Sequence, residues 1–167
     1  MSALIVTAAL GKADFAWLDA QRRAHFPPDR NQLAAHLTLF HALPPSSEVE
    51  ASSLFARLAA SEAPPRAMIA GLMNLGRGVA YRIVSDDLER IRRDIADHFH
   101  GSLTAQDSQG WRPHVTIQNK VEPSVARGLL RELETAFEAR PLVVRGLALN
   151  RYLGGPWEAM GEWVFRG

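Results

Sequence analysis

Hydrophobic and polar residues follow two rhythms along this chain, one typical of strands and the other of helices. Short apolar runs rich in β-branched residues, such as Ala-Leu-Ile-Val-Thr-Ala-Ala at residues 3–9, indicate buried strands. Apolar residues at helical spacing, ended by Pro27-Pro28, predict an amphipathic helix over residues 14–26. The other predicted helices cover about residues 46–61, 85–99 and 123–137. The predicted strands cover residues 3–9, 33–43, 66–75, 79–84, 113–121, 142–152 and 157–165.

The order of these elements divides the chain into two similar halves. Each half reads strand, helix, strand, helix, strand, and the second half ends with one strand more. The halves are about 80 residues each, which is too long for a solenoid repeat, and no linker-like composition separates them. The sequence therefore predicts a single α+β domain over residues 1–167, made of two lobes whose helices cover one face of each sheet.

Composition narrows the classes of function. Hydrophobic residues make up 47% of the 167 residues and charged residues 22%, which is typical of a folded globular protein. The absence of cysteine excludes disulfides, thiol nucleophiles and cysteine-ligated zinc or iron–sulfur sites. A formal net charge of +1 argues against a dedicated duplex nucleic-acid binder, but it leaves room for a pocket that holds one phosphate. Because the sequence shows neither a secretory signal nor an apolar run of membrane length, we expect a cytoplasmic protein.

Two of the six histidines occur in matching contexts. Segments 36–39 (His-Leu-Thr-Leu) and 114–117 (His-Val-Thr-Ile) both read histidine, apolar, threonine, apolar, and both fall in a predicted strand that follows a helix. Because alternate residues of a strand share a face, the histidine and threonine of each motif should point together. The apolar residues then face the core, and the polar side chains should line a groove, since burying them without partners would be costly.

These four side chains, His36, Thr38, His114 and Thr116, suit phosphodiester chemistry without a metal. Imidazoles titrate near neutral pH, so one can accept a proton while the other donates one. Threonine hydroxyls can hold the non-bridging phosphate oxygens. No cluster of Asp or Glu lies beside either motif, which argues against a two-metal mechanism, and two histidines alone are an incomplete ligand set. We therefore expect no metal and no cofactor.

The paired motifs resemble those of the two-histidine (2H) phosphoesterase superfamily, and most closely the bacterial 2′-5′ RNA ligase and RNA 2′,3′-cyclic phosphodiesterase family. The positions of the motifs and the duplicated α+β order extend the resemblance over nearly the whole chain. It implies a bilobal fold in which two antiparallel-rich sheets flank a central cleft, with the helices outside and the histidines facing each other. It also implies hydrolysis of a 2′,3′-cyclic phosphate, usually to a 2′-phosphate, with reversible 2′-5′ ligation in some members.

The resemblance also assigns roles to the motif residues. One of His36 and His114 would activate water, and the other would protonate the departing ribose oxygen. The usual polarity of the family makes His36 the acid and His114 the base. Thr38 and Thr116 would bind the phosphate. Further side chains on or near this face are the candidate substrate contacts, namely Phe40, Tyr81, Arg112, Gln118 and Lys120.

Other residues near the motifs are expected to be structural. His41 should point to the face opposite His36, because the two positions differ by an odd number of residues. Arg92 belongs to a charged run that is typical of a solvated helix face. Trp111, like Tyr81, is more typical of a core aromatic than of a platform for a base.

The sequence leaves the substrate open between an RNA terminus and a small nucleotide. The residues after the motifs, Phe40-His41 and Gln118-Asn119-Lys120, depart from the commonest family pattern where specificity would be set. The near-neutral charge favours a short substrate. The same site could act on another cyclic or 2′-5′-linked nucleotide, such as ADP-ribose cyclic phosphate, or the protein could bind a nucleotide or RNA without turning it over. Neither a membrane nor an obligate protein partner is expected.

Overall fold

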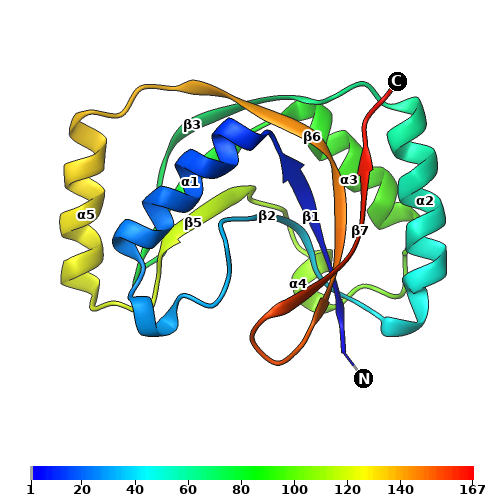
Figure 1. Cartoon of the computed structure of the whole chain (residues 1–167), viewed down its shortest axis with the longest axis horizontal. Coiled ribbons are helices and arrows are strands. Elements are labelled where there is room, and N and C mark those ends of the chain that lie inside the picture. The colour runs from blue at the N-terminus through cyan, green and yellow to red at the C-terminus, as the bar shows by residue number, and fades with distance from the viewer. Residues whose placement is uncertain (1) are drawn as a thin grey trace.

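The computed structural model describes residues 2–167 and has the expected α+β architecture, with strands and helices in the predicted order (Figure 1). The strands are β1 (Leu4–Leu10), β2 (Leu37–Leu43), β3 (Arg66–Asn74), β4 (Val79–Val84), β5 (His114–Gln118), β6 (Arg140–Tyr152) and β7 (Trp157–Val164). The α-helices are α1 (Lys12–His25), α2 (Glu48–Ser61), α3 (Asp86–His98), α4 (Ala105–Ser108) and α5 (Pro123–Thr135). Two short 3₁₀ helices cover Pro28–Arg30 and Pro45–Ser47. The sequence did not predict α4 or the 3₁₀ helices, because segments of three or four residues are too short to show a period.

The strands form one hydrogen-bonded sheet in which every pairing is antiparallel. Its order is β1-β2-β5-β4-β3-β6-β7, and β6 also pairs with β1, so the first six strands of this order close on themselves. The long strand β6 pairs with β3 through residues 140–143 and with β1 through residues 144–151. The two sheets implied by the resemblance are therefore joined into one, through β6 and through a short contact between β2 and β5.

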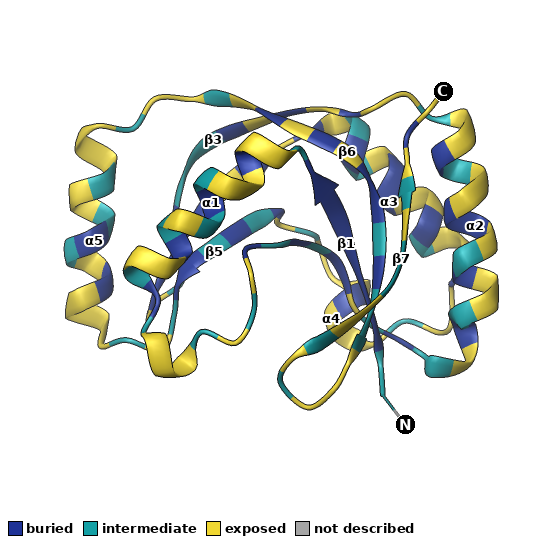
Figure 2. Cartoon of the chain, in the orientation of Figure 1, coloured by how far each residue is buried: buried dark blue, intermediate teal, exposed yellow. Residues whose placement is uncertain are grey.

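The helices cover the sheet in two groups, which lie on opposite sides of Figure 1. α1 and α5 pack against β3, β4 and β5, whereas α2 and α3 pack against β3, β6 and β7. Each group turns a buried stripe inward and an exposed face outward (Figure 2). In α3 the stripe consists of Leu88, Ile91 and Ile95 at helical spacing, and the Ser85 hydroxyl caps the helix by accepting from the Leu88 amide. Within residues 2–167, no helix is both long and apolar enough to cross a membrane.

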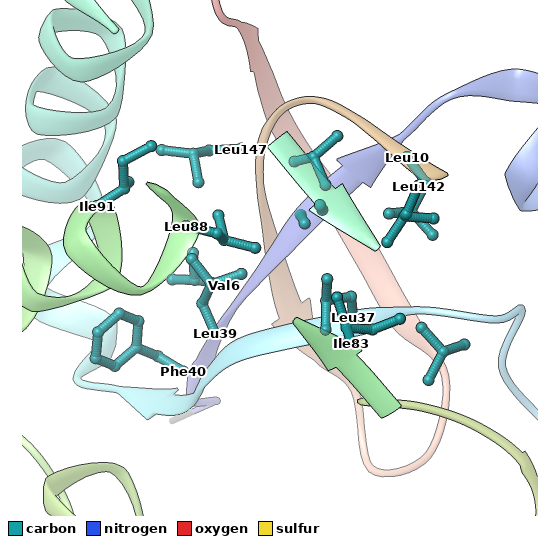
Figure 3. Close-up of a cluster of buried hydrophobic side chains, with 14 of the residues drawn as sticks. Val6, Leu10, Leu37, Leu39, Phe40, Ile83, Leu88, Ile91, Leu142 and Leu147 are labelled. Atoms are coloured by element: carbon teal, nitrogen blue, oxygen red, sulfur yellow. The ribbon is translucent and has the colours of Figure 1, made fainter. Parts of the chain in front are cut away.

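The hydrophobic core lies between the sheet and the helices and fixes the orientation of β2. Leu37 and Leu39 of β2 are fully buried and belong to the same cluster as Leu88 and Ile91 of α3 (Figure 3). Burying a leucine side chain stabilises the fold by about 2–3 kcal/mol. Because this face of β2 is buried, the histidine and threonine of the first motif are turned to the other face.

Both motif strands are shorter than predicted. β2 begins at Leu37 rather than at residue 33, because the Asp19 carboxylate accepts a hydrogen bond from the Ala35 amide (2.9 Å) in place of a neighbouring strand. β5 ends at Gln118 rather than at residue 121, because Lys120 has a φ of 64°, which takes the backbone out of the extended conformation.

Candidate functional site

The two His-x-Thr motifs lie side by side on adjacent antiparallel strands. β2 and β5 pair at Leu37 and Val115, the second position of each motif. Both residues are fully buried, so the flanking histidine and threonine of each motif point to the opposite face. The antiparallel register then sets the histidine of each motif opposite the threonine of the other, around a local two-fold axis. The local duplication in the sequence therefore becomes a symmetric arrangement of four polar side chains.

The same backbone contact orients both imidazoles. The Nδ1 atom of His36 lies 2.9 Å from the carbonyl oxygen of Ala34, and that of His114 lies 2.7 Å from the carbonyl oxygen of Arg112. A carbonyl oxygen can only accept, so each Nδ1 must carry the proton of its hydrogen bond. In both rings Nε2 is therefore the atom that is free to exchange a proton with a ligand.

One pocket of about 320 Å³ brings His36, Thr38, His114 and Thr116 together. This volume is at the lower end of the range for small-molecule sites. Hollows of about 550 and 700 Å³ occur elsewhere, but neither is lined by a histidine. Side chains from other parts of the chain complete the pocket, and they include His41, Arg92, Asp107, Trp111, Arg112 and Trp157. Of the candidate substrate contacts, the pocket includes Arg112.

β2 departs from strict alternation just after its motif. Opposite β1, Val6 pairs with Phe40 while the next residue, Thr7, pairs with Thr38, so β2 contains one extra residue between Thr38 and Phe40. Such a bulge exchanges the faces of the residues that follow it. Phe40 is consequently fully buried, and the expectation that it shares the motif face is wrong. His41 lines the pocket, which also corrects the expectation that it points away.

The three remaining candidate contacts lie outside this pocket. Tyr81 is 3% exposed, and its hydroxyl donates to Oε1 of Gln21 (3.3 Å) on the side of α1. Gln118 is 4% exposed, and its Oε1 atom has no hydrogen-bond partner among the described residues. Lys120 is exposed beyond the end of β5. Gln118 lies on the same strand face as His114, but it is four residues further along β5, which is roughly 13 Å. It is therefore too far along the strand to line the pocket.

Two buried arginines brace the motif strands from opposite halves of the chain. Arg22 of α1 donates from Nη1 to the carbonyl oxygen of Thr116 (3.1 Å), and Arg92 of α3 donates from Nε to that of Leu39 (3.0 Å). Burial lowers the pKa of both guanidinium groups. Arg92 is 8% exposed and lies 4.5 Å above the ring of Phe40, so the prediction of a solvated helix face is wrong for it.

Two tryptophans add aromatic surface to the pocket. The ring centroid of Trp157, at the start of β7, lies 4.6 Å from that of His36. Trp111 donates its indole Nε1–H to the carbonyl oxygen of Thr38 (3.0 Å). Aromatic faces in such a position suit stacking on a nucleobase. Sequence reasoning missed Trp157, because only the tertiary structure brings β7 beside the first motif and no local pattern marks it.

Burial sets the charge of His36 in the free protein. The pKa of this ring is lowered to about 4, and desolvation by burial is the largest cause. The hydrogen bond to Ala34 opposes the shift, and the positive charge of Arg22 adds to it. His36 is therefore neutral at neutral pH and presents a lone pair at Nε2. In the described part of the chain, no three His, Asp or Glu side chains are arranged so that they could hold a metal ion.

The chain is similar to known proteins over nearly its whole length. A family model described as the 2′-5′ RNA ligase superfamily matches residues 11–156, whereas no curated protein matches. TT0787 of Thermus thermophilus is similar in structure over 100% of this chain and 99% of its own, with a TM-score of 0.68 and 21% identity. Escherichia coli LigT complexed with 3′-AMP is similar over 99% of each chain, with a TM-score of 0.60 and 16% identity. At these identities the structural likeness is one of fold.

Proposed function

Because the chain belongs to the 2′-5′ RNA ligase superfamily, a group of phosphoesterases and ligases, we propose that it is a metal-independent phosphodiesterase that opens 2′,3′-cyclic phosphates. The substrate is the end of an RNA or a small nucleotide, and the product is the 2′-phosphate. The observation that carries the proposal is the symmetric pairing of the two motifs in one pocket, with both imidazole Nε2 atoms free.

The proposed reaction needs one base and one acid, which the two imidazoles supply. The neutral imidazole takes a proton from water through Nε2, and the water oxygen forms a new bond to phosphorus. The bond between phosphorus and the 3′ oxygen breaks, and the protonated imidazole gives its Nε2 proton to that oxygen. The products are a 2′-phosphate and a 3′-hydroxyl. With a 5′-hydroxyl in place of water as the attacking group, the same step would break the bond to the 3′ oxygen and form a 2′-5′ linkage.

The remaining pocket residues suit the charge and shape of a nucleotide. The hydroxyls of Thr38 and Thr116 flank the two imidazoles and can donate to the non-bridging oxygens, where charge builds up in the transition state. Arg112 adds a positive charge and Trp157 a ring face on which a base can stack. Solved LigT structures complexed with 3′-AMP, with ATP and with phosphate support a nucleotide as the ligand class.

Which histidine is the acid and which is the base depends on the step at which His36 gains a proton. The resemblance makes His36 the acid, yet this ring is neutral in the free protein because burial lowers its pKa to about 4. An anionic phosphate bound beside the ring would offset the positive charge of Arg22 and favour the protonated form. In this order His36 takes up its proton together with the substrate, and His114 is the base.

The test is hydrolysis of adenosine 2′,3′-cyclic phosphate and of a short RNA ending in a cyclic phosphate, both in the presence of EDTA. We expect turnover by the wild type and a loss of about 10²–10⁴-fold in His36→Ala and in His114→Ala. Chromatography should identify the 2′-phosphate as the product. His100→Gln, which changes an exposed histidine outside the pocket, is the matched control and should keep wild-type activity.

Three results would contradict the proposal. Nucleotide binding without turnover would make the protein a binder rather than an enzyme. Activity that disappears with EDTA and returns with a divalent metal would replace the proposed mechanism with a metal-dependent one. Full activity in both alanine variants would place the chemistry elsewhere in the molecule.

A further inference from the structure

The pocket contains a third imidazole that the proposed reaction does not use. The bulge in β2 turns His41 toward the pocket, where about 45% of its side chain is exposed. Its Nδ1 atom lies 3.2 Å from Oδ1 of Asp107, a residue of α4 that is 2% exposed. The carboxylate accepts the hydrogen bond from Nδ1, so Nε2 is the ring atom left available to a ligand.

The carboxylate of Asp107 is satisfied without this imidazole. Its two oxygens accept from the backbone amides of His41 (2.9 and 3.0 Å) and Ala42 (2.9 Å), which ties α4 to β2. Burial raises the pKa of Asp107, but the hydrogen bonds from His41 and Ala42 outweigh it and hold the pKa below its usual value. Asp107 is therefore ionised, and its hydrogen bond with Nδ1 orients the His41 ring.

The surroundings of His41 suit an anion. Two cations share the pocket with it, Arg92 from α3 and Arg112 before β5, and neither forms an ion pair among residues 2–167. Asp107 is the one carboxylate that lines the pocket in the described structure, and its oxygens are turned to the β2 backbone. His36, just before the start of β2, also lines the pocket and is neutral in the free protein. The two arginines and the one carboxylate therefore leave the surroundings of His41 positive on balance.

The position of His41 relative to Thr38 indicates which anion it would bind. His41 is three residues beyond Thr38 on β2, which is at most roughly 10 Å along the strand. A cyclic phosphate held at Thr38 leaves the other end of its ribose, the 5′ carbon, to extend along the pocket. A phosphate on that carbon would be the next negative charge in any ribonucleotide.

We propose that His41, oriented by Asp107, forms a second anion subsite that binds the 5′-phosphate of a nucleoside 2′,3′-cyclic phosphate. The inference rests on the proposed function of the same pocket, and it narrows the substrate to molecules with a phosphate on both sides of the terminal ribose. Such a phosphate occurs as a diester in RNA and as a terminal group in a small nucleotide. His41 is a substrate-binding residue in this assignment, and Asp107 is a positioning residue.

The experiment compares three substrates that share one reacting group. They are adenosine 2′,3′-cyclic phosphate, its 5′-phosphorylated form, and the dinucleotide ApA ending in the cyclic phosphate. We expect kcat/KM to be about tenfold higher for the two compounds with a second phosphate, since a charge-assisted hydrogen bond is worth roughly that factor. A higher kcat/KM for the 5′-phosphorylated mononucleotide alone would identify small nucleotides as the substrate class. An equal increase for ApA ending in the cyclic phosphate would extend the substrate class to RNA ends.

Variants of the subsite separate this role from a structural one. His41→Gln should reduce the ratio of kcat/KM with and without the second phosphate to near one. His41→Arg should retain this preference, because arginine places a positive charge and N–H donors at the same position. Asp107→Asn, which keeps oxygen as the acceptor for the backbone amides, should lower the preference less than His41→Gln. The control His100→Gln should keep the full preference.

A binding measurement keeps the subsite testable apart from catalysis. Calorimetry on the wild type and His41→Gln would use 2′-AMP and adenosine 2′,5′-bisphosphate. Tighter binding of the bisphosphate by the wild type alone would support the subsite, even if no turnover were found and the proposed function failed. Equal preference for the second phosphate in the wild type and His41→Gln, in binding or in turnover, would overturn the inference.

Discussion

The two motif strands carry the same side chains in different surroundings. On β5 the alternation is regular through residues 114–117, with the motif side chains on one face and fully buried residues on the other. On β2, His36 lies just before the first strand residue and beside the ring of Trp157, and the bulge after Thr38 brings His41 into the pocket. The repeated motif therefore accounts for the two imidazoles, and the different surroundings of the two strands make them inequivalent.

In the proposed reaction this asymmetry matters, because proton transfer there needs two histidines in different protonation states. Two identical imidazoles would gain and lose protons together, whereas a base and an acid must differ at one pH. Burial and the charge of Arg22 act on His36, and both lower its pKa. Arg22 contacts the second motif strand through a hydrogen bond to the backbone carbonyl oxygen of Thr116. The differences between the halves are thus concentrated around the first motif.

The largest expected effect tests the division of roles between His36 and His114. Thymidine 3′-(4-nitrophenyl phosphate) has a leaving group that needs no proton, and it lacks the 2′-hydroxyl that could attack phosphorus. On this compound the variant without the acid should recover most of the 10²–10⁴-fold loss seen on the cyclic phosphate, roughly the full contribution of acid catalysis. The variant without the base should not recover. Parallel kinetics of His36→Ala and His114→Ala on both substrates measure the difference.

Our assignment is that His36→Ala is the variant that recovers. Recovery in His114→Ala instead would reverse the order of acid and base but would leave the two-histidine mechanism intact. Recovery in neither variant, or the same partial recovery in both, would mean that the two imidazoles do not divide the roles. The comparison between the strands would then have no catalytic meaning.

The sequence was sufficient to predict that the four motif side chains lie together, and the reason is local. A strand alternates its faces every residue, so a His-x-Thr pattern in an apolar strand determines which side chains point together, and the paired motifs resemble a superfamily that the family match confirms. Sequence reasoning predicted the wrong face for Phe40 and His41, because the bulge depends on the pairing with β1 and no pattern within β2 indicates it. It also failed for Arg92, whose buried partners lie on β2 and α4.

The next expected effect concerns the two arginines that cross between the halves. Replacing either with Met removes a guanidinium from buried carbonyl oxygens and should lower the free energy of unfolding by about 1–3 kcal/mol. Arg92→Met should cost more than Arg22→Met, because both hydrogen bonds of Arg92 go to backbone carbonyl oxygens, whereas one of the two from Arg22 goes to the side chain of Asn31, which can turn to another partner. Urea unfolding of both variants tests this order.

Lysine variants at the same two positions provide the control. A lysine keeps the charge but cannot present the planar fork of arginine, so Arg92→Lys should lie between the wild type and Arg92→Met. Equal stability of Arg92→Met and the wild type would show that the brace does not hold β2. Arg22→Met has a second readout, because losing this positive charge should raise the pKa of His36, which NMR titration can follow.

The elements of the fold could be predicted better than their connections. Helices such as α3 show a strong periodic stripe and a Ser85 cap that are both local signals. The closure of the sheet depends on β6, which pairs with β3 through its first residues and with β1 through later ones. Because these partners are far away in the sequence, periodicity predicts the strand but not its neighbours.

The smallest expected effect is on stability and isolates the burial of His36 from catalysis. The folded-state pKa is about 4, against about 6.5 in the unfolded chain. Between these values the unfolded chain binds a proton that the folded protein excludes, so the free energy of unfolding should fall as the pH drops from about 6.5 toward 4. We expect His36 to contribute about 1–2 kcal/mol to this fall, since a half-buried ring keeps part of its hydration.

Urea unfolding of the wild type and of His36→Gln at a series of pH values measures this contribution. His36→Gln cannot titrate, so its unfolding curve should lose less stability on acidification than that of the wild type. His100→Gln replaces an exposed histidine outside the pocket and is the control, which should follow the wild type. If His36→Gln also followed the wild type, His36 would be as hydrated in the free protein as in the unfolded chain. The difference between the two motif histidines would then have to arise only when a substrate enters the pocket.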